Sequence, residues 1–287
     1  RRGNTFIRLI YINVGIFVIG TLISVVLQLF NLSAAGIFDL FALPASLHRF
    51  IIQPWSLLTY MFMHAGFLHI LFNMLWLYWF GSLFLYFFSG KHLRGVYVLG
   101  GICGGLFYMA AYNIFPYFSE VLPHATLVGA SASVLAIAAT AYREPNYRVQ
   151  LFLFGAIRLK YLALIVIGTD LLFITSNNAG GHIAHLGGAL AGLWFAASLS
   201  KGKDLTSGIN WFIDGFASLF QKKTWKRKPK MKVHYGSDTS REKDYDYNAR
   251  KKAQSDEVDR ILEKLKKSGY ESLTTEEKKS LFDASKR

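Results

Sequence analysis

Apolar segments of membrane-spanning length fill most of the first 200 residues and limit what the chain can fold into. Hydrophobic residues make up 52% of the 287 residues, and aromatic residues make up 16%. A helix needs about 20 consecutive, mostly apolar residues to cross ~30 Å of hydrocarbon. The pattern predicts an all-α, polytopic membrane protein whose first span is a retained helix, not a cleaved signal peptide. The six predicted spans, of which the fourth and fifth are short, are residues 6–30, 67–88, 96–115, 127–142, 161–174 and 181–199.

Basic residues beside these spans predict their orientation. Lysine and arginine gather before the first span, between the second and third, between the fourth and fifth, and after the sixth. The other loops, residues 31–66, 116–126 and 175–180, contain Arg49 as their only lysine or arginine. Because cytoplasmic loops are enriched in lysine and arginine, both termini are predicted to be cytoplasmic. The chain begins with Arg1, not methionine, so we expect a further segment to precede it.

The formal net charge of +14 fits a membrane surface better than a nucleic acid. Most of the excess lies beside the spans and in the tail, where it favours contact with anionic lipid headgroups. We therefore expect membrane lipid as a partner and no nucleic acid. A single cysteine, Cys103, excludes an internal disulfide and supplies no pair of metal ligands.

Four polar residues lie at one predicted depth in the second, fourth and sixth spans. His69 and Asn73 are in the second span, Ser131 in the fourth and His185 in the sixth, each within about two turns of the outer end. Polar groups inside a membrane are costly and indicate chemistry or transport. A serine and a histidine on different helices are the minimum parts of a nucleophile activated by a general base. The remaining polar groups can then serve as oxyanion donors.

Small residues on these spans favour the close helix contact that such a site needs. Gly129 and Ala130 precede Ser131, and Gly188 and Gly192 form a GxxxG seam in the sixth span. Residues three or four apart share a helix face, so the seam lies on the face that carries His185. The pattern predicts that this face packs against the span of the serine.

Each of these polar residues also has a structural interpretation, as a packing position, an interfacial group or an interhelical hydrogen bond. Ser133 is a rival nucleophile, but two residues along a helix rotate it by about 200° from Ser131, so only one of them can face the histidine. His182 is one turn before His185 on the same face. His182 and His64 are predicted to lie near the mouth of the site without an assigned role.

The ordered set of motifs resembles the rhomboid family of intramembrane serine proteases, in its six-span bacterial form. The resemblance covers residues 54–192. It implies a six-helix bundle embedded in a bacterial inner membrane. The motifs are Pro54-Trp55 with Thr59, His64-Ala65-Gly66, His69-Ile70-Leu71-Phe72-Asn73, Gly129-Ala130-Ser131, and Ala184-His185-Leu186-Gly187-Gly188 with Gly192.

Carried onto this chain, the resemblance implies that Ser131 is the nucleophile and His185 the general base. The backbone amide of Ser131, with His69 and Asn73, would form the oxyanion hole. No cofactor or metal is implied, and the dyad works without the third carboxylate of soluble serine proteases. Asp170 is the only acidic residue within a predicted span and lies near its outer end, where it could approach the site, but we expect a packing or structural role.

Three positions depart from the family pattern. The glycine that usually follows the nucleophile is Ala132, the aromatic residue that usually stacks on the histidine is Leu135, and the arginine that usually follows the loop tryptophan is Ser56. No reacting atom is lost. The packing of the oxyanion hole, the restraint on the imidazole and the shape of the first loop are the properties these changes affect.

The expected substrates are transmembrane segments of other proteins, cut near the extracytoplasmic face. Helical hydrogen bonds shield peptide carbonyls, so segments with helix-weakening residues at that end should be preferred. Two alternatives stay open. One is a transport or metal-binding protein that uses His64, His69, His182 and His185 as ligands. The other is a non-catalytic rhomboid-like protein that binds membrane helices.

The cytoplasmic tail is predicted to have three parts after the membrane domain of residues 1–200. Residues 201–232 carry an amphipathic helix and a basic segment, which either lies on the lipid surface or packs on the ends of the spans. Residues 233–254 are predicted to be a flexible linker. Residues 255–287 are predicted to be a small helical hairpin that docks on the protein itself or on an unknown partner. Gly269 would end its first helix, and Thr274 to Glu277 would be a capping box for the second.

Overall fold

The computed structural model describes residues 4–140, 145–151, 155–220 and 238–285. It divides the chain into two units, residues 1–222 and residues 223–287. The first unit contains all of the apolar helices, and the second contains the polar helices of the tail. The two units are therefore described separately.

Four helices of the first unit are long and apolar enough to cross a membrane among the described residues. They are α1 (Asn4–Leu29), α5 (Phe67–Phe87), α6 (Gly90–Ile114) and α9 (Ala179–Ser200). The fourth and fifth predicted spans correspond to shorter helices, α7 (Ser131–Ala139, 9 residues) and α8 (Leu159–Leu172, 14 residues). At 1.5 Å per residue, α7 extends only ~14 Å, so the prediction of six full spans is not confirmed.

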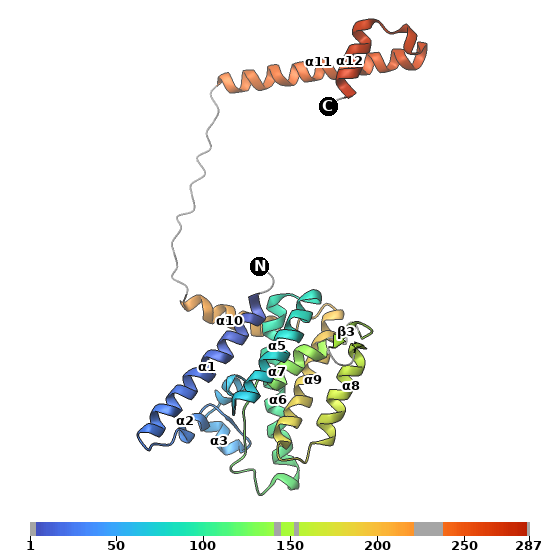
Figure 1. Ribbon diagram of the computed structural model, residues 1–287. Helices are drawn as coiled ribbons and strands as arrows, with labels where there is room; N and C mark the ends of the chain where they lie inside the picture. The colour runs from blue at the N-terminus through green and yellow to red at the C-terminus, as the bar shows by residue number, and fades with distance from the viewer. Residues whose placement is uncertain (1–3, 141–144, 152–154, 221–237, 286–287) are drawn as a thin grey trace. The chain divides into compact units, whose positions relative to one another are not determined.

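α7 lies at the centre of the first unit, next to α5, α6 and α9 (Figure 1). Most of its side chains are buried, and two glycines of α9 allow close contact with it. A Cβ at Gly188 would meet the carbonyl oxygen of Ala132, and one at Gly192 would meet that of Ala136. Both pairs are four residues apart, so α7 and α9 run in the same direction and the predicted glycine seam is in contact with α7.

The first loop is folded against the segment that leads into α7. Its helices are α2 (Ala35–Asp39), α3 (Leu47–Ile52), α4 (Ser56–Thr59) and the 3₁₀ turn η1 (Tyr60–Phe62). Strand β1 (Leu43–Pro44) pairs antiparallel with β2 (Thr126–Leu127), with Leu43 opposite Leu127 and Pro44 opposite Thr126. This pairing fixes the chain just before the serine.

The remaining short elements of this unit depart from a purely helical fold. The 3₁₀ turn η2 (Pro116–Phe118) follows α6. Strands β3 (Arg148–Leu151) and β4 (Gly155–Arg158) form an antiparallel hairpin before α8. The predicted all-α class is therefore correct for the main elements, but two small sheets accompany them.

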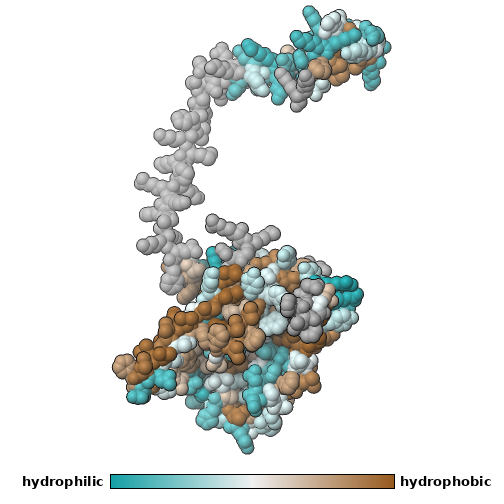
Figure 2. Space-filling model, in the orientation of Figure 1, coloured by the Kyte–Doolittle hydropathy of each residue, from teal (hydrophilic) through white to brown (hydrophobic). Residues whose placement is uncertain are grey.

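The surface of the first unit has the apolar character expected of a protein in lipid. Figure 2 shows a hydrophobic band along α1, where Leu22 is 60% exposed and Leu29 is 78% exposed. Side chains of this kind would be exposed to water in a soluble protein but are well solvated by lipid tails. Together with the four long helices, they make this a membrane protein.

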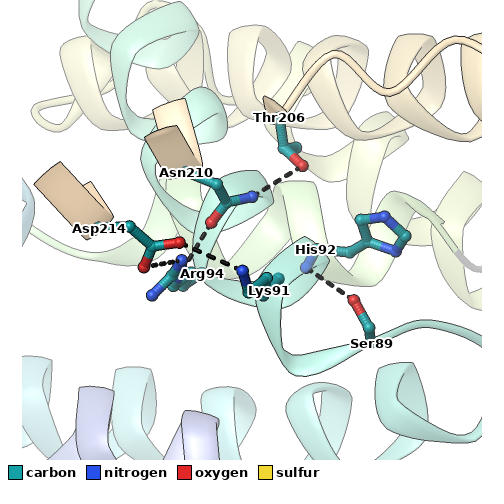
Figure 3. Close-up of polar contacts among 7 residues, drawn as sticks. All are labelled: Ser89, Lys91, His92, Arg94, Thr206, Asn210 and Asp214. Carbon is teal, nitrogen blue, oxygen red and sulfur yellow. Dashed lines mark hydrogen bonds and ion pairs between the residues drawn. The ribbon is translucent and has the colours of Figure 1, made fainter. Parts of the chain in front are cut away.

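Helix α10 (Ser207–Phe220) is fastened to the start of α6 by its polar face (Figure 3). Arg94 donates from Nε to Asn210 Oδ1 at 2.6 Å and also pairs with Asp214, which Lys91 contacts at 3.2 Å. The pKa of Asp214 is lowered, chiefly by its hydrogen bond from Arg94. The opposite face exposes Trp211 and other apolar side chains. The predicted packing on the end of a span is therefore observed at the polar face, and contact of this helix with lipid stays a prediction.

The tail unit differs from its prediction at the linker. Helix α11 (Asp238–Ser268) is continuous, so residues 238–254 are helical where the sequence predicted a flexible segment. Composition explains the difference, because Glu, Lys, Arg and Ala are good helix formers even where no apolar face exists. Residues 221–237, which include the rest of the predicted linker and the basic segment, lie outside the described residues.

The predicted helical hairpin is present in the tail unit. Gly269 follows α11 with φ +75°, and the turn η4 (Tyr270–Ser272) leads into α12 (Thr275–Ser285). The capping box forms as predicted: the backbone N–H of Thr274 donates to Glu277, and that of Glu277 donates to the Thr274 hydroxyl. Lys264 of α11 binds Glu277 at 2.9 Å, which ties the two helices together.

Candidate active site

Ser131 is the first residue of α7, directly after a sharp turn of the backbone. Gly129 has φ +135°, a conformation that residues with side chains rarely adopt, and its N–H donates to the carbonyl of Tyr60 at 3.0 Å. The first N–H groups of a helix have no intrahelical partner, and they carry the positive end of its dipole. The hydroxyl and the backbone amide of Ser131 therefore sit where developing negative charge is stabilised.

His69 lies beside this turn. A Cβ at Gly129 would be 2.9 Å from His69 Nε2 and 3.6 Å from Ser131 Oγ, so the imidazole and the hydroxyl flank the same small space. Only glycine at position 129 leaves that space open. The structure thus brings His69 of α5 to the N-terminus of α7, where an N–H donor can reach an oxyanion.

Asn73 is one helical turn after His69 and is 6% exposed. Its Nδ2 donates to the carbonyl of His69 at 2.9 Å, within the same helix. This bond uses one of the two amide hydrogens and orients the side chain. Among the described residues, Asn73 makes no hydrogen bond to Ser131, so its part in an oxyanion hole stays a prediction.

His185 is held near the start of α7 by the contact between α7 and α9. It is three residues before Gly188, which packs on Ala132, the residue after Ser131. His185 also lies close enough to His69 to interact with it electrostatically. Within the described part of the chain, no hydrogen bond joins Ser131 to His185. Catalytic hydrogen bonds are often long before substrate binds, so the lack of this bond is compatible with Ser131 as a nucleophile and His185 as its base.

Asp170 of α8 contacts both histidines of α9. Its Oδ1 is 2.9 Å from Nδ1 of His185 and 2.8 Å from Nδ1 of His182, and the residue is 4% exposed. Of the two roles that the sequence left open for Asp170, approach to the site is thus observed, although a packing or structural role was the one expected. The available signal was its rarity: it was the only acidic residue of the predicted spans, opposite two histidines one turn apart.

Ser133 points away from the candidate site. Its hydroxyl is fully buried, lies 3.9 Å from the sulfur of Met61 and faces Gly101 of α6. The rotation expected from helix geometry is thus observed, and Ser131 is the serine at the site.

His64 packs edge-on against His69, with 5.2 Å between the ring centroids. It precedes α5, and burial, with a smaller contribution from His69, lowers the pKa of His64 to about 4. His64 is therefore neutral near pH 7 and shapes the site without adding charge.

Of the four histidines predicted as possible metal ligands, only two lie in a group that could hold a metal ion. Among the described residues, Asp170, His182 and His185 have ligand atoms within 4.8 Å of one another, while His64 and His69 are not part of that group. The two nitrogen–oxygen distances of 2.8 and 2.9 Å are those of hydrogen bonds. The four-histidine alternative therefore does not form as one cluster, and the cluster that does form is linked by hydrogen bonds.

Two of the departures from the family pattern have structural explanations. The methyl group of Ala132 faces Gly104 of α6, where a Cβ would come within 2.6 Å, so a glycine on the neighbouring helix makes room for it. Ser56 begins α4 and is fully buried, and its hydroxyl has no hydrogen-bond partner among the described residues. Neither change displaces a reacting group.

Comparison with known proteins agrees with this geometry. A family model described as the rhomboid domain matches residues 52–202, more than half of the chain. The chain belongs to the rhomboid family. The matched region contains Ser131, His185, His69, Asn73 and Asp170.

One curated relative in this family is the RHOMBOID-like protein 12, mitochondrial, of Arabidopsis thaliana. The two are 30% identical over 158 residues, which cover 52% of this chain and 47% of the relative. The chain thus matches about half the length of that rhomboid. In the tail, residues 241–287 match a family of unknown function (DUF6576).

Proposed function

We propose that this rhomboid is an intramembrane serine protease that cuts transmembrane segments near the extracytoplasmic face. The observation that carries the proposal is the position of Ser131 at the N-terminus of α7, with the imidazole of His69 across the space left by Gly129. A hydroxyl at a helix N-terminus suits acyl transfer when one imidazole lies beside it and the adjacent helix, here α9, carries a second, His185.

In the proposed reaction, His185 Nε2 accepts the proton of Ser131 Oγ as the oxygen attacks the scissile carbonyl. The oxyanion that forms is stabilised by the backbone N–H of Ser131, by His69 and by Asn73. When the intermediate collapses, His185 returns the proton to the leaving amine. Water then attacks the acyl-enzyme: His185 accepts a proton from the water and gives it to Ser131 Oγ as the ester bond breaks.

The substrate must expose a peptide carbonyl that a membrane helix normally keeps bonded. Segments that unwind easily near one end are therefore the proposed substrates, reached laterally from the bilayer. The excess of basic residues beside the spans supports a multi-pass location with both termini in the cytoplasm. The resemblance of the motifs to the bacterial form of the family is the ground for proposing a bacterial inner membrane.

The test uses the detergent-solubilised protein and a fluorophosphonate probe, which phosphonylates only activated serines. The native protein should be labelled, and Ser131→Ala and His185→Ala should not. Ser133→Ala is the matched control, because it removes a neighbouring buried hydroxyl, and it should still be labelled. Labelling that persists in Ser131→Ala, with all variants folded by thermal melting, would refute the assignment.

The second candidate function is a non-catalytic protein that binds membrane helices. It is favoured by one observation, the lack of a hydrogen bond between Ser131 and His185 in the described structure. A folded native protein that no fluorophosphonate labels would support this candidate over the protease.

A further inference from the structure

We propose that Asp170 is the positioning residue for His185, so that this rhomboid works with a Ser131–His185–Asp170 triad in place of a dyad. The proposal rests on the proposed protease function. It concerns how the general base is held, which neither the family match nor the motifs assign.

The geometry is that of a carboxylate orienting an imidazole. Asp170 Oδ1 lies 2.9 Å from His185 Nδ1, within hydrogen-bond distance. When Nδ1–H donates to a carboxylate, the neutral ring carries its lone pair on Nε2. Nε2 is the atom that must accept the proton from Ser131, so this bond selects the tautomer that the reaction needs.

Asp170 joins α8 to α9 through the two imidazoles. They are its only hydrogen-bond partners among the described residues, and Oδ2 is buried without a partner. Its hydrogen bonds therefore go to the candidate base and to the neighbouring histidine, and none goes to an arginine, a lysine or a backbone N–H in the described structure. A buried carboxylate with one oxygen unpaired lowers stability. Ionisable residues within membrane segments usually have a function, because they are costly to keep there.

The substitution at position 135 supplies an independent reason for the carboxylate. The family usually stacks an aromatic ring on the histidine from this position, but here Leu135 lines a small cavity with Ala189 and Val166. Ala189 is one helical turn beyond His185. A leucine offers no ring to stack on the imidazole. Asp170 can supply the lost restraint from the neighbouring helix.

His182 shares the same carboxylate oxygen and limits how the carboxylate can rotate. Its Nδ1 is 2.8 Å from Asp170 Oδ1, and its ring lies 5.9 Å from that of Phe173, centroid to centroid. His182 is six residues before Gly188, a further turn from the contact with α7 than His185. His185 is therefore the histidine positioned to accept the proton of Ser131, and His182 helps to orient Asp170, which both histidines contact.

During the reaction the carboxylate stays ionised. As Ser131 Oγ bonds to the substrate carbonyl carbon, its proton moves to Nε2 and His185 becomes an imidazolium. Asp170 stabilises this cation through Nδ1–H. When the C–N bond breaks, the proton passes from Nε2 to the leaving amine, and His185 is neutral again.

The test measures saturable labelling by a fluorophosphonate probe, which separates probe affinity (KI) from the rate of the chemical step (kinact). Asp170→Asn should lower kinact by about 100-fold or more, because a similar change in soluble triads costs about 10⁴-fold in kcat. KI and the melting temperature should stay near native. Asp170→Glu, which keeps the charge, should recover part of the loss. His182→Gln should lower kinact by less than about 10-fold, since the carboxylate retains His185.

The outcomes separate this proposal from the proposed function. Labelling of Ser131→Ala would refute the protease itself. Loss of labelling in Ser131→Ala with native kinact in a folded Asp170→Asn would overturn the triad alone. Loss of melting temperature in Asp170→Asn, with kinact unchanged in the folded fraction, would also overturn it.

Proton NMR gives a second measurement that does not depend on any variant of Asp170 folding. The Nδ1–H proton of an imidazole bound to a carboxylate resonates strongly downfield. His182 Nδ1 contacts the same oxygen, so the His185 proton is observed by itself in His182→Gln. We expect a downfield resonance in His182→Gln and its loss in the double variant His182→Gln/His185→Ala. A folded His182→Gln protein without it would contradict the hydrogen bond on which the triad rests.

Discussion

At the scale of single residues, the candidate site depends on small side chains that leave room for its larger ones. Gly129 keeps the space between His69 and Ser131 open, and Gly104 accepts the methyl group of Ala132. His64 completes the wall behind His69, with both ring nitrogens buried. These residues take no part in bond making, yet each determines whether the reacting atoms have room.

His64 should make the protein sensitive to acid. Its pKa is lowered from the usual 6.5 to about 4 in the folded state, so the unfolded state binds the proton more readily between these values. Stability should therefore be complete above pH 6.5 and decrease as the pH falls towards 4. Thermal melting in detergent at pH 7 and pH 4.5 measures this decrease. His64→Asn should reduce it, whereas the same change at the exposed His48 should not; equal decreases in native protein and His64→Asn would contradict the account.

At the scale of helices, the contact between α7 and α9 joins the helix that begins with Ser131 to the helix that carries His185. Two glycines of α9 lie on backbone carbonyls of α7, so the helices touch without intervening side chains. Spacing in the sequence predicted this seam and the face that carries His185. It also predicted that Ser133 would turn away from the site, since both follow from the geometry of a single helix.

Gly188→Ala tests this contact. The added Cβ would meet the carbonyl of Ala132 and force the helices apart, with an expected loss of about 1–3 kcal/mol in stability and a large loss of probe labelling. Gly168→Ala is the matched control, because a Cβ there meets nothing within 4 Å, and it should be neutral or stabilise α8 slightly. Melting temperature and labelling rate measure both effects. Native labelling in Gly188→Ala would show that the helices do not depend on this close approach.

The sequence allowed Asp170 to approach the site, but it could not predict the contact with the two histidines. Periodicity defines the face of one helix, but the rotation of α8 about its own axis depends on packing with its neighbours. For the same reason the sequence could not choose between lipid contact and helix contact for α10, whose polar face contacts α6. The helical part of the predicted linker was missed because α11 has charged side chains in place of an apolar stripe there.

At the scale of the whole molecule, the site belongs entirely to the first unit. Ser131, His185, Asp170, His69 and Asn73 all lie within residues 1–222, and the tail unit has its own buried residues, including Ile261 and Leu273. The hairpin of the tail therefore has a core of its own and contributes none of these five residues. A docking partner for the tail, or docking on the protein itself, stays a prediction.

A chain that ends at Lys222 should therefore keep native probe labelling. Its kinact and KI should match those of the full chain, because the five site residues and the helices that carry them all lie within residues 1–222. The same truncation with Ser131→Ala gives the background. A drop in kinact of the folded, truncated protein would show that the tail acts on the site.

The central claim is that Ser131 is an activated nucleophile, and mapping the probe adduct by peptide mass spectrometry tests it most directly. The account predicts one phosphonylated residue, Ser131, in the native protein and no adduct in His185→Ala. An adduct on Ser133 or any other serine, or no adduct on a folded native protein, would contradict it.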